Sequence, residues 1–332
     1  METNGELEEL NRHIAALNRA GRYTDVEPLL HRALELTRER YGEDDPQYAT
    51  ILNDLGALYR ATGEYAKSET SFLKAMETIG RVRGEEHPDY ATCVNNLAGL
   101  YRLAGDYGKA EQLFLQAWDI YGKTLGEEHF LYASNLNNLA LLYQDMGDYD
   151  RAEELQLQAL DIGRRTGGEQ GVPYATSLCN LAATYTAKGN LGEADDALHQ
   201  ALDIYRRTVG TEHPLYASAL NNLAGLHYAR GEYSEAERRY LEVLEVCAAI
   251  WGQEHPNYAS GLSSVARVYE EAGKYDQATR SYVRSMEIRR RVLGESHPDY
   301  VDTLNNLAAL CDRMGDTAKA EQYRQQAGEA AQ

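Results

Sequence analysis

Seven tyrosines recur at an unbroken interval of 42 residues, and this repeat constrains the fold more than any other feature of the chain. They are Tyr48, Tyr90, Tyr132, Tyr174, Tyr216, Tyr258 and Tyr300. Two series of glycines keep the same interval, one beginning at Gly42 and the other at Gly63. A fixed period of this length is typical of an array of one supersecondary unit, and two glycines per unit indicate two turns in each.

Apolar residues between these turns recur at helical spacing. In the second full repeat, intervals of three and four residues lead from Tyr90 to Tyr101 and again from Tyr107 to Tyr121, which places each series on one face of a helix. A proline at position 88 fits the first turn of a helix, where its missing N–H costs nothing. Each repeat is therefore predicted to be an antiparallel pair, helix A followed by helix B, with helix A starting near Pro88.

The array is predicted to occupy the whole chain, residues 1–332, as a single all-α domain. We expect a right-handed α-solenoid (superhelix) of about eight antiparallel helix pairs. Residues 1–45 are predicted to form an atypical N-terminal capping repeat, 46–316 six full repeats and the start of the last, and 317–332 a C-terminal capping helix. Polar caps are expected because each unit buries its apolar face on its neighbours.

Charge and hydropathy narrow the class of partner. The chain has 52 acidic and 33 basic residues, for a net charge of −19, so nucleic acid and anionic membrane surfaces are disfavoured. No apolar run approaches the roughly 20 residues that span a bilayer. We therefore expect a cytoplasmic protein with a protein or peptide partner that is neutral or basic overall. The sequence leaves self-association open.

One motif resembles a known family. The segments Asn95-Asn96-Leu97-Ala98-Gly99-Leu100-Tyr101, Gly105-Asp106-Tyr107 and Ala110-Glu111 are similar to the tetratricopeptide repeat signature. The commonest form of that repeat has roughly 34 residues, whereas the longer period here, with His-Pro-x-Tyr-Ala before Asn-Asn-Leu-Ala, resembles the kinesin light chain group and its bacterial relatives. The likeness covers nearly the whole chain and weakens in the fourth and sixth full repeats. It implies a helical solenoid that binds partners in a concave groove.

The stripe of helix A opposite its predicted core face carries asparagine in most repeats, and in tetratricopeptide stacks this face lines the groove. The candidate binding residues are Asn53, Arg60, Asn95, Asn96, Arg102, Asn137, Asn138, Asn180, Asn221, Asn222, Asn305 and Asn306. A carboxamide has both donors and an acceptor, so a row of them can hold the backbone of an extended peptide. Alternatively, the same amides bond to neighbouring helices and hold the stack together.

Residues with catalytic or metal-binding potential have simpler interpretations. Five histidines precede helix A, namely His87, His129, His213, His255 and His297, but helices about 10 Å apart cannot bring them to one ion. We interpret them as helix-start residues. The four cysteines are far apart and form no Cys-x-x-Cys pair, and no phosphate loop or nucleophile elbow occurs. We therefore predict no catalysis, no cofactor and no metal.

Two functions fit these features. The first is a protein–protein interaction scaffold or adaptor that binds a peptide or partner segment in the asparagine-lined groove. The alternative is a sensor or regulatory arm of a larger effector, a protease or a nucleotide-dependent switch, whose effector part is not in this chain. Bacterial arrays that this one resembles suggest the second function.

Overall fold

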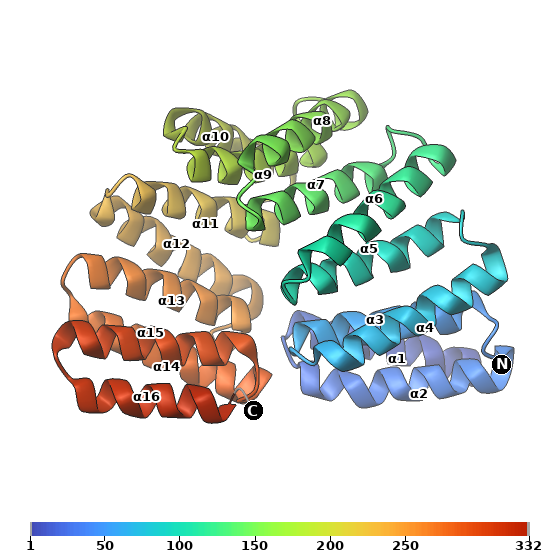
Figure 1. Cartoon of the computed structure of the whole chain (residues 1–332), viewed down its shortest axis with the longest axis horizontal. Coiled ribbons are helices and arrows are strands. Elements are labelled where there is room, and N and C mark those ends of the chain that lie inside the picture. Colours follow the sequence, from blue (N-terminus) through green and yellow to red (C-terminus); the bar gives the residue numbers. More distant parts are fainter. Residues whose placement is uncertain (1, 331–332) are drawn as a thin grey trace. The chain divides into compact units, whose positions relative to one another are not determined.

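The computed structural model describes residues 2–330, with side chains from residue 5 onward, and its regular elements over that range are α-helices (Figure 1). They are α1 (Glu2–Arg19), α2 (Tyr23–Tyr41), α3 (Pro46–Ala61), α4 (Tyr65–Arg83), α5 (Pro88–Leu103), α6 (Tyr107–Thr124), α7 (Phe130–Asp145), α8 (Tyr149–Gly167), α9 (Val172–Lys188), α10 (Leu191–Thr208), α11 (Pro214–Ala229), α12 (Tyr233–Trp251), α13 (Pro256–Glu271), α14 (Tyr275–Leu293), α15 (Pro298–Met314) and α16 (Thr317–Ala330). The predicted all-helical fold of successive antiparallel pairs, the arrangement typical of an α-solenoid, is confirmed. None of these helices combines the length and apolar character that crossing a membrane requires.

Contacts divide the chain into two compact units. The first holds the described residues up to Ala16 with Asp25–Ile204, and the second holds Leu17–Thr24 with the described residues from Tyr205 onward. In each unit helix A packs on helix B of the same repeat, as α5 does on α6, and helix B packs on the next helix A, as α6 does on α7. One continuous solenoid with caps at 1–45 and 317–332 stays a prediction.

Most A helices begin at a histidine. Nδ1 of His87 accepts a hydrogen bond from the backbone N of Asp89 at 3.1 Å, and Pro88 occupies the first turn of α5. The imidazole nitrogen thus caps a helix N-terminus as the carboxylate of Asp45 does in α3. The same bond recurs at His129, His213, His255 and His297. These residues are helix-start residues, as predicted.

Glycine ends the helices where the backbone must turn. Gly84, between α4 and α5, has φ of +87°, and Gly105, between α5 and α6, has φ of +79°. Both values lie in the left-handed region that residues with a Cβ seldom adopt. This requirement explains why two glycine series follow the repeat.

Small residues allow helices A and B to approach each other. Ala98 of α5 and Ala110 of α6 are completely buried, and Phe114 packs beside them. At the position of Ala98 the preceding repeat has Gly56, where an added Cβ would lie 2.6 Å from the ring of Phe72. The core side of helix A is therefore closely packed, and its opposite side is left for other contacts.

Candidate functional site

The predicted binding residues lie on the A helices, at half-buried or exposed positions outside the buried core. We call this surface the asparagine face and describe it for each unit separately. In the first unit it includes Asn53 (α3), Asn95 and Asn96 (α5), Asn137 and Asn138 (α7) and Asn180 (α9), and in the second unit Asn221 and Asn222 (α11) and Asn305 and Asn306 (α15). Asn305 is exposed and the others are half-buried.

Part of this face holds neighbouring A helices together. Asn96 donates from Nδ2 to Oδ1 of Asn53 at 3.0 Å, and Asn138 makes the equivalent bond to Oδ1 of Asn95 at 3.1 Å. These bonds connect α3 with α5 and α5 with α7. They engage the acceptor oxygens of Asn53 and Asn95, whereas the amide nitrogens of these two residues make no hydrogen bond within the described chain.

Asn135 belongs to the same network, although the sequence did not identify it. It is 1% exposed and donates to Oδ1 of Asn95 at 3.1 Å, while its own Oδ1 is buried without a partner. Other repeats have Cys93 or Thr303 at this core position. The sequence could have indicated Asn135 through one feature, a carboxamide at a repeat position that elsewhere has a smaller residue.

Other asparagines of the face remain unengaged. The side chains of five make no hydrogen bond in the part of the chain that the structure describes: Asn137, Asn180, Asn221, Asn305 and Asn306. Oδ1 of Asn137 is buried as well as unpaired. Asn222 differs from them because it has an interaction partner. The face therefore has two kinds of carboxamide, some that connect helices and some that are free to bind a guest.

The two predicted arginines behave differently. Nη1 of Arg102 forms an ion pair with Oδ2 of Asp145 at 2.5 Å, across α5 and α7. Arg60 has no ion pair among the described residues, and its guanidinium lies over the ring of Phe72, 6.0 Å from the centroid. Burial, followed by the charge of Arg102, lowers the pKa of Arg60. An added Cβ at Gly99 would lie 2.9 Å from Nη1 of Arg60, so glycine permits this approach.

A second set of cross-repeat contacts was not predicted. The hydroxyl of Tyr59 donates to Oε1 of Glu27 at 2.7 Å, and that of Tyr143 donates to Oε1 of Glu111 at 2.6 Å. Tyr101 and Glu69 form the same pair. Each bond joins helix A to helix B of the preceding repeat. Their separation of 32 residues becomes meaningful only once the stacking order is known.

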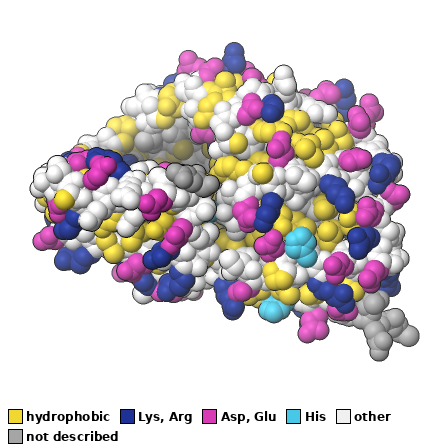
Figure 2. Space-filling model, turned by 60° about the horizontal axis from the view of Figure 1, so that its bottom comes forward, with side chains coloured by type: hydrophobic (Ala, Val, Ile, Leu, Met, Phe, Trp, Pro, Cys, Tyr) yellow, Lys and Arg dark blue, Asp and Glu magenta, His cyan; other side chains and the backbone are white. Residues whose placement is uncertain are grey.

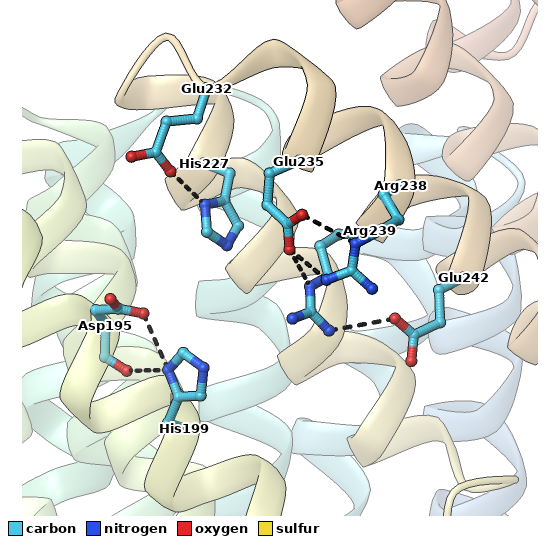
Figure 3. Close-up of polar contacts among 8 residues, drawn as sticks. All are labelled: Asp195, His199, His227, Glu232, Glu235, Arg238, Arg239 and Glu242. Carbon is cyan, nitrogen blue, oxygen red and sulfur yellow. Dashed lines mark hydrogen bonds and ion pairs between the residues drawn. The ribbon is translucent and has the colours of Figure 1, made fainter.

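Charged side chains elsewhere are largely paired locally. On α12, Glu235 contacts Arg238 and Arg239, and these arginines lower its pKa to about 2 (Figure 3). His227 faces Glu232 in Figure 3. Its Nδ1 lies 2.6 Å from Oε2 of Glu232. On the face that Figure 2 shows, acidic and basic side chains are interspersed without a large block of one sign. Such exposed pairs contribute little to stability, as is usual for a solvated surface.

Comparisons with known proteins agree with this architecture. The family described as tetratricopeptide repeat matches residues 7–77, 50–123, 131–207, 173–249 and 253–332. No curated protein matches the chain in sequence.

Several solved structures are similar to this chain. One contains nearly identical TPR-like repeats of a putative kinesin light chain from Podosopora anserina and is 28% identical in sequence. The match covers 62% of this chain and 97% of that chain, with a TM-score of 0.49. BtubC (BKLC) from P. vanneervenii has 24% identity, with 70% and 93% covered and a TM-score of 0.54. A Rap protein complexed with Competence and Sporulation Factor has 15% identity, with 99% and 97% covered and a TM-score of 0.61.

Proposed function

Because this chain belongs to the tetratricopeptide repeat family, whose members generally mediate protein–protein interactions, we propose that it is a scaffold or adaptor whose asparagine face binds an extended peptide. The observation that carries the proposal is the set of unengaged carboxamides, among them Asn180 in α9 and Asn221 in α11. A half-buried amide without a partner has an unused hydrogen-bonding capacity that a guest backbone can satisfy.

Asn53 and Asn95, which already connect neighbouring helices, keep part of their hydrogen-bonding capacity. With the oxygens of Asn53 and Asn95 engaged, their amide nitrogens remain available to donate to guest carbonyl groups. Packed helices are about 8–10 Å apart, and an extended peptide advances about 3.3 Å per residue. One repeat therefore spans about three peptide residues. Contacts to the backbone at this spacing hold a peptide without reading every side chain.

Charge selects the kind of peptide. With a net charge of −19, the chain attracts basic segments, does not repel neutral ones and repels polyanions. The partner we propose is therefore a neutral or basic segment of a protein, with neither nucleic acid nor an anionic membrane as its ligand. Arg60 adds a local preference for one acidic group, since its guanidinium, which has no ion pair among the described residues, would donate hydrogen bonds to a carboxylate of the guest.

The test begins with peptides selected from a displayed random library on the immobilised chain, whose affinities are then measured by fluorescence anisotropy. Asn180→Ala and Asn221→Ala remove carboxamides that make no bond in the free chain. Each should weaken peptides that contact it by about 3–15-fold, the equivalent of one hydrogen bond, without lowering the melting temperature.

The matched control is Gln158→Ala, which removes an exposed carboxamide from helix B of the fourth pair. Its affinity for the same peptides should equal that of the wild type. The proposal is rejected if no peptide is enriched over an empty support, or if all three variants bind every enriched peptide as the wild type does.

A further inference from the structure

A pocket opens beside the asparagine face in the second unit. It has a volume of about 310 Å³ and lies between α11, α12 and α13. Val243 and Cys247 of α12 form its buried floor, and Ser218 and Ser260 are exposed at its mouth. Asn221, one of the unengaged carboxamides, also lines it.

The pocket exists because this repeat has a small residue where others have a large one. Cys247 occupies the register position of Tyr121, Tyr205 and Arg289. In the first unit the side chain of Tyr121 fills this space, and its hydroxyl lies 3.0 Å from Oγ1 of Thr92. In the next repeat Arg289 fills it and donates to Oγ1 of Thr303 at 2.7 Å.

A small residue at this position does not by itself leave a pocket. Gly163 has the same register position in α8, but there α9 approaches so closely that an added Cβ would lie 3.0 Å from the backbone N of Tyr174. At Cys247 the space stays open, and the facing residue of α13 is Gly261, which has no side chain to enter it.

The lining determines what the pocket can hold. No charged side chain lines it, although 26% of the chain is charged. The thiol of Cys247 is neutral at physiological pH, because burial raises its pKa to about 11. Trp251 adds an aromatic wall and stacks on His255 at a centroid distance of 5.3 Å. An ion placed here would lose its hydration without a counter-charge, whereas an apolar group would not.

Size and position then identify the occupant. The volume lies at the lower end of the range for small-molecule sites, about 300–1,000 Å³, and suits a single side chain better than a whole ligand. Asn221 at the rim can bond to the backbone of the residue whose side chain enters.

We propose that this pocket anchors one uncharged apolar side chain, of leucine, methionine or phenylalanine size, from the peptide bound along the asparagine face. The inference rests on the proposed function and makes α11–α13 the place where the face selects a side chain. Buried apolar anchors of this kind contribute a large share of binding energy in protein interfaces. The remaining carboxamides would then fix the peptide's path and direction.

The test uses blocked amino acids, so that it does not depend on peptide binding. N-acetyl-leucinamide, N-acetyl-phenylalaninamide and N-acetyl-lysinamide are each titrated into the full chain, and the indole N–H signals of its two tryptophans are followed by NMR. The Trp251 signal should shift and saturate with the two apolar amides, with dissociation constants of about 1–10 mM. The lysine derivative should bind about tenfold or more weakly. The Trp118 signal, in the first unit, should stay in place.

Cys247→Tyr fills the pocket with the residue found in other repeats, and its hydroxyl has Ser218 at the register position of Thr92 as partner. This substitution should abolish the Trp251 response. Ser218→Leu, at an exposed position, covers the mouth of the pocket and should abolish the response too. It replaces the first variant if Cys247→Tyr folds poorly. Leu241→Ala, at an exposed site on the same helix, should respond like the wild type.

The inference is overturned if the Trp251 signal does not shift with any of the three amides, or if it still shifts in both pocket variants. Saturating binding of amides without enrichment of any peptide would leave the pocket intact and reject the proposed function instead. Peptide binding that Asn180→Ala weakens, without any response of Trp251 to the amides, would reject only the pocket.

Discussion

Asn138 lies one repeat and one residue beyond Asn95 and donates a hydrogen bond to its side-chain oxygen at 3.1 Å. The same offset of 43 residues links Asn96 with Asn53 and Arg102 with Asp145. In the second unit it links Arg313 with Glu270. Adjacent A helices are thus displaced by one residue along their contact. The displacement alone does not decide which amides connect helices, because Asn137 and Asn180 are also 43 residues apart and make no bond to each other.

Asn95→Ala should lower the free energy of unfolding by about 1–3 kcal/mol, because it removes the acceptor of both Asn135 and Asn138 and leaves the buried Asn135 amide unpaired. Asn180→Ala, which breaks no bond, should change it by less than about 0.5 kcal/mol. Urea unfolding followed by circular dichroism measures both. Equal losses would show that the connecting amides do not stabilise the stack.

Alkaline pH should destabilise the chain through its tyrosines. Burial raises the pKa of Tyr101 from 10.0 to about 12, and its bond to Glu69 and the charge of that carboxylate add to the effect. A pKa that is higher in the folded state adds stability below the unfolded value, and this contribution is lost as the pH rises from 10.0 towards about 12. The urea midpoint should therefore fall between about pH 9 and about pH 11.

The alkaline decrease of the urea midpoint should be smaller in Tyr101→Phe, because phenylalanine has no proton to lose at that position. Glu69→Gln keeps a hydrogen-bond acceptor but removes the charge, so its midpoint should decline by an intermediate amount. A decline of the same size in all three proteins would assign the alkaline sensitivity to other groups.

A buried polar pair replaces an apolar one between α8 and α9. The hydroxyl of Thr184 donates to Oε1 of Gln156 at 2.6 Å, and both residues are completely buried. Other repeats have Phe72 or Phe114 and Leu100 or Leu142 at these two positions. Gln156→Phe alone leaves the Thr184 hydroxyl without its acceptor and should cost about 1–3 kcal/mol.

Adding Thr184→Leu to Gln156→Phe should restore stability to within about 1 kcal/mol of the wild type or above it, because both completely buried polar side chains are then gone. Gln144, which donates to Oγ1 of Thr184, loses this acceptor, but it is only half-buried. The double-mutant cycle, measured by urea unfolding, reports the coupling between the two sites. Additive losses in the double variant would mean that the site rejects the larger side chains for steric reasons.

The sequence predicted those features that local signals determine. His87 and Pro88 marked the start of α5, and Gly105 marked its end, because capping and φ depend on neighbouring residues only. The face on which Asn95 lies followed from helical periodicity. The first helix starts at Glu2, within the segment 1–45 that was predicted as an N-terminal capping repeat.

The pairing of side chains across repeats could not be predicted in the same way. Periodicity places Asn95 and Asn138 on equivalent faces, but the one-residue displacement between them depends on how the two helices pack. Asn135 and Gln156 are polar residues at core positions, and only their partners in the structure explain them. The pocket beside Cys247 likewise depends on the distance between helices, as the contrast with Gly163 shows.

Helices A and B approach each other closely at Ala98. Ala98 is completely buried among Ala110, Phe114 and Leu139, so the larger side chain in Ala98→Leu must displace α6 or α7. The loss should be about 1–3 kcal/mol in urea unfolding, the usual cost of overpacking. Ala66→Leu makes the same substitution at an exposed position of α4 and should change stability by less than about 0.5 kcal/mol. If the two variants unfolded at the same urea concentration, the alanine in the repeat would be dispensable for packing, and the regular stacking on which the asparagine face depends would need another cause.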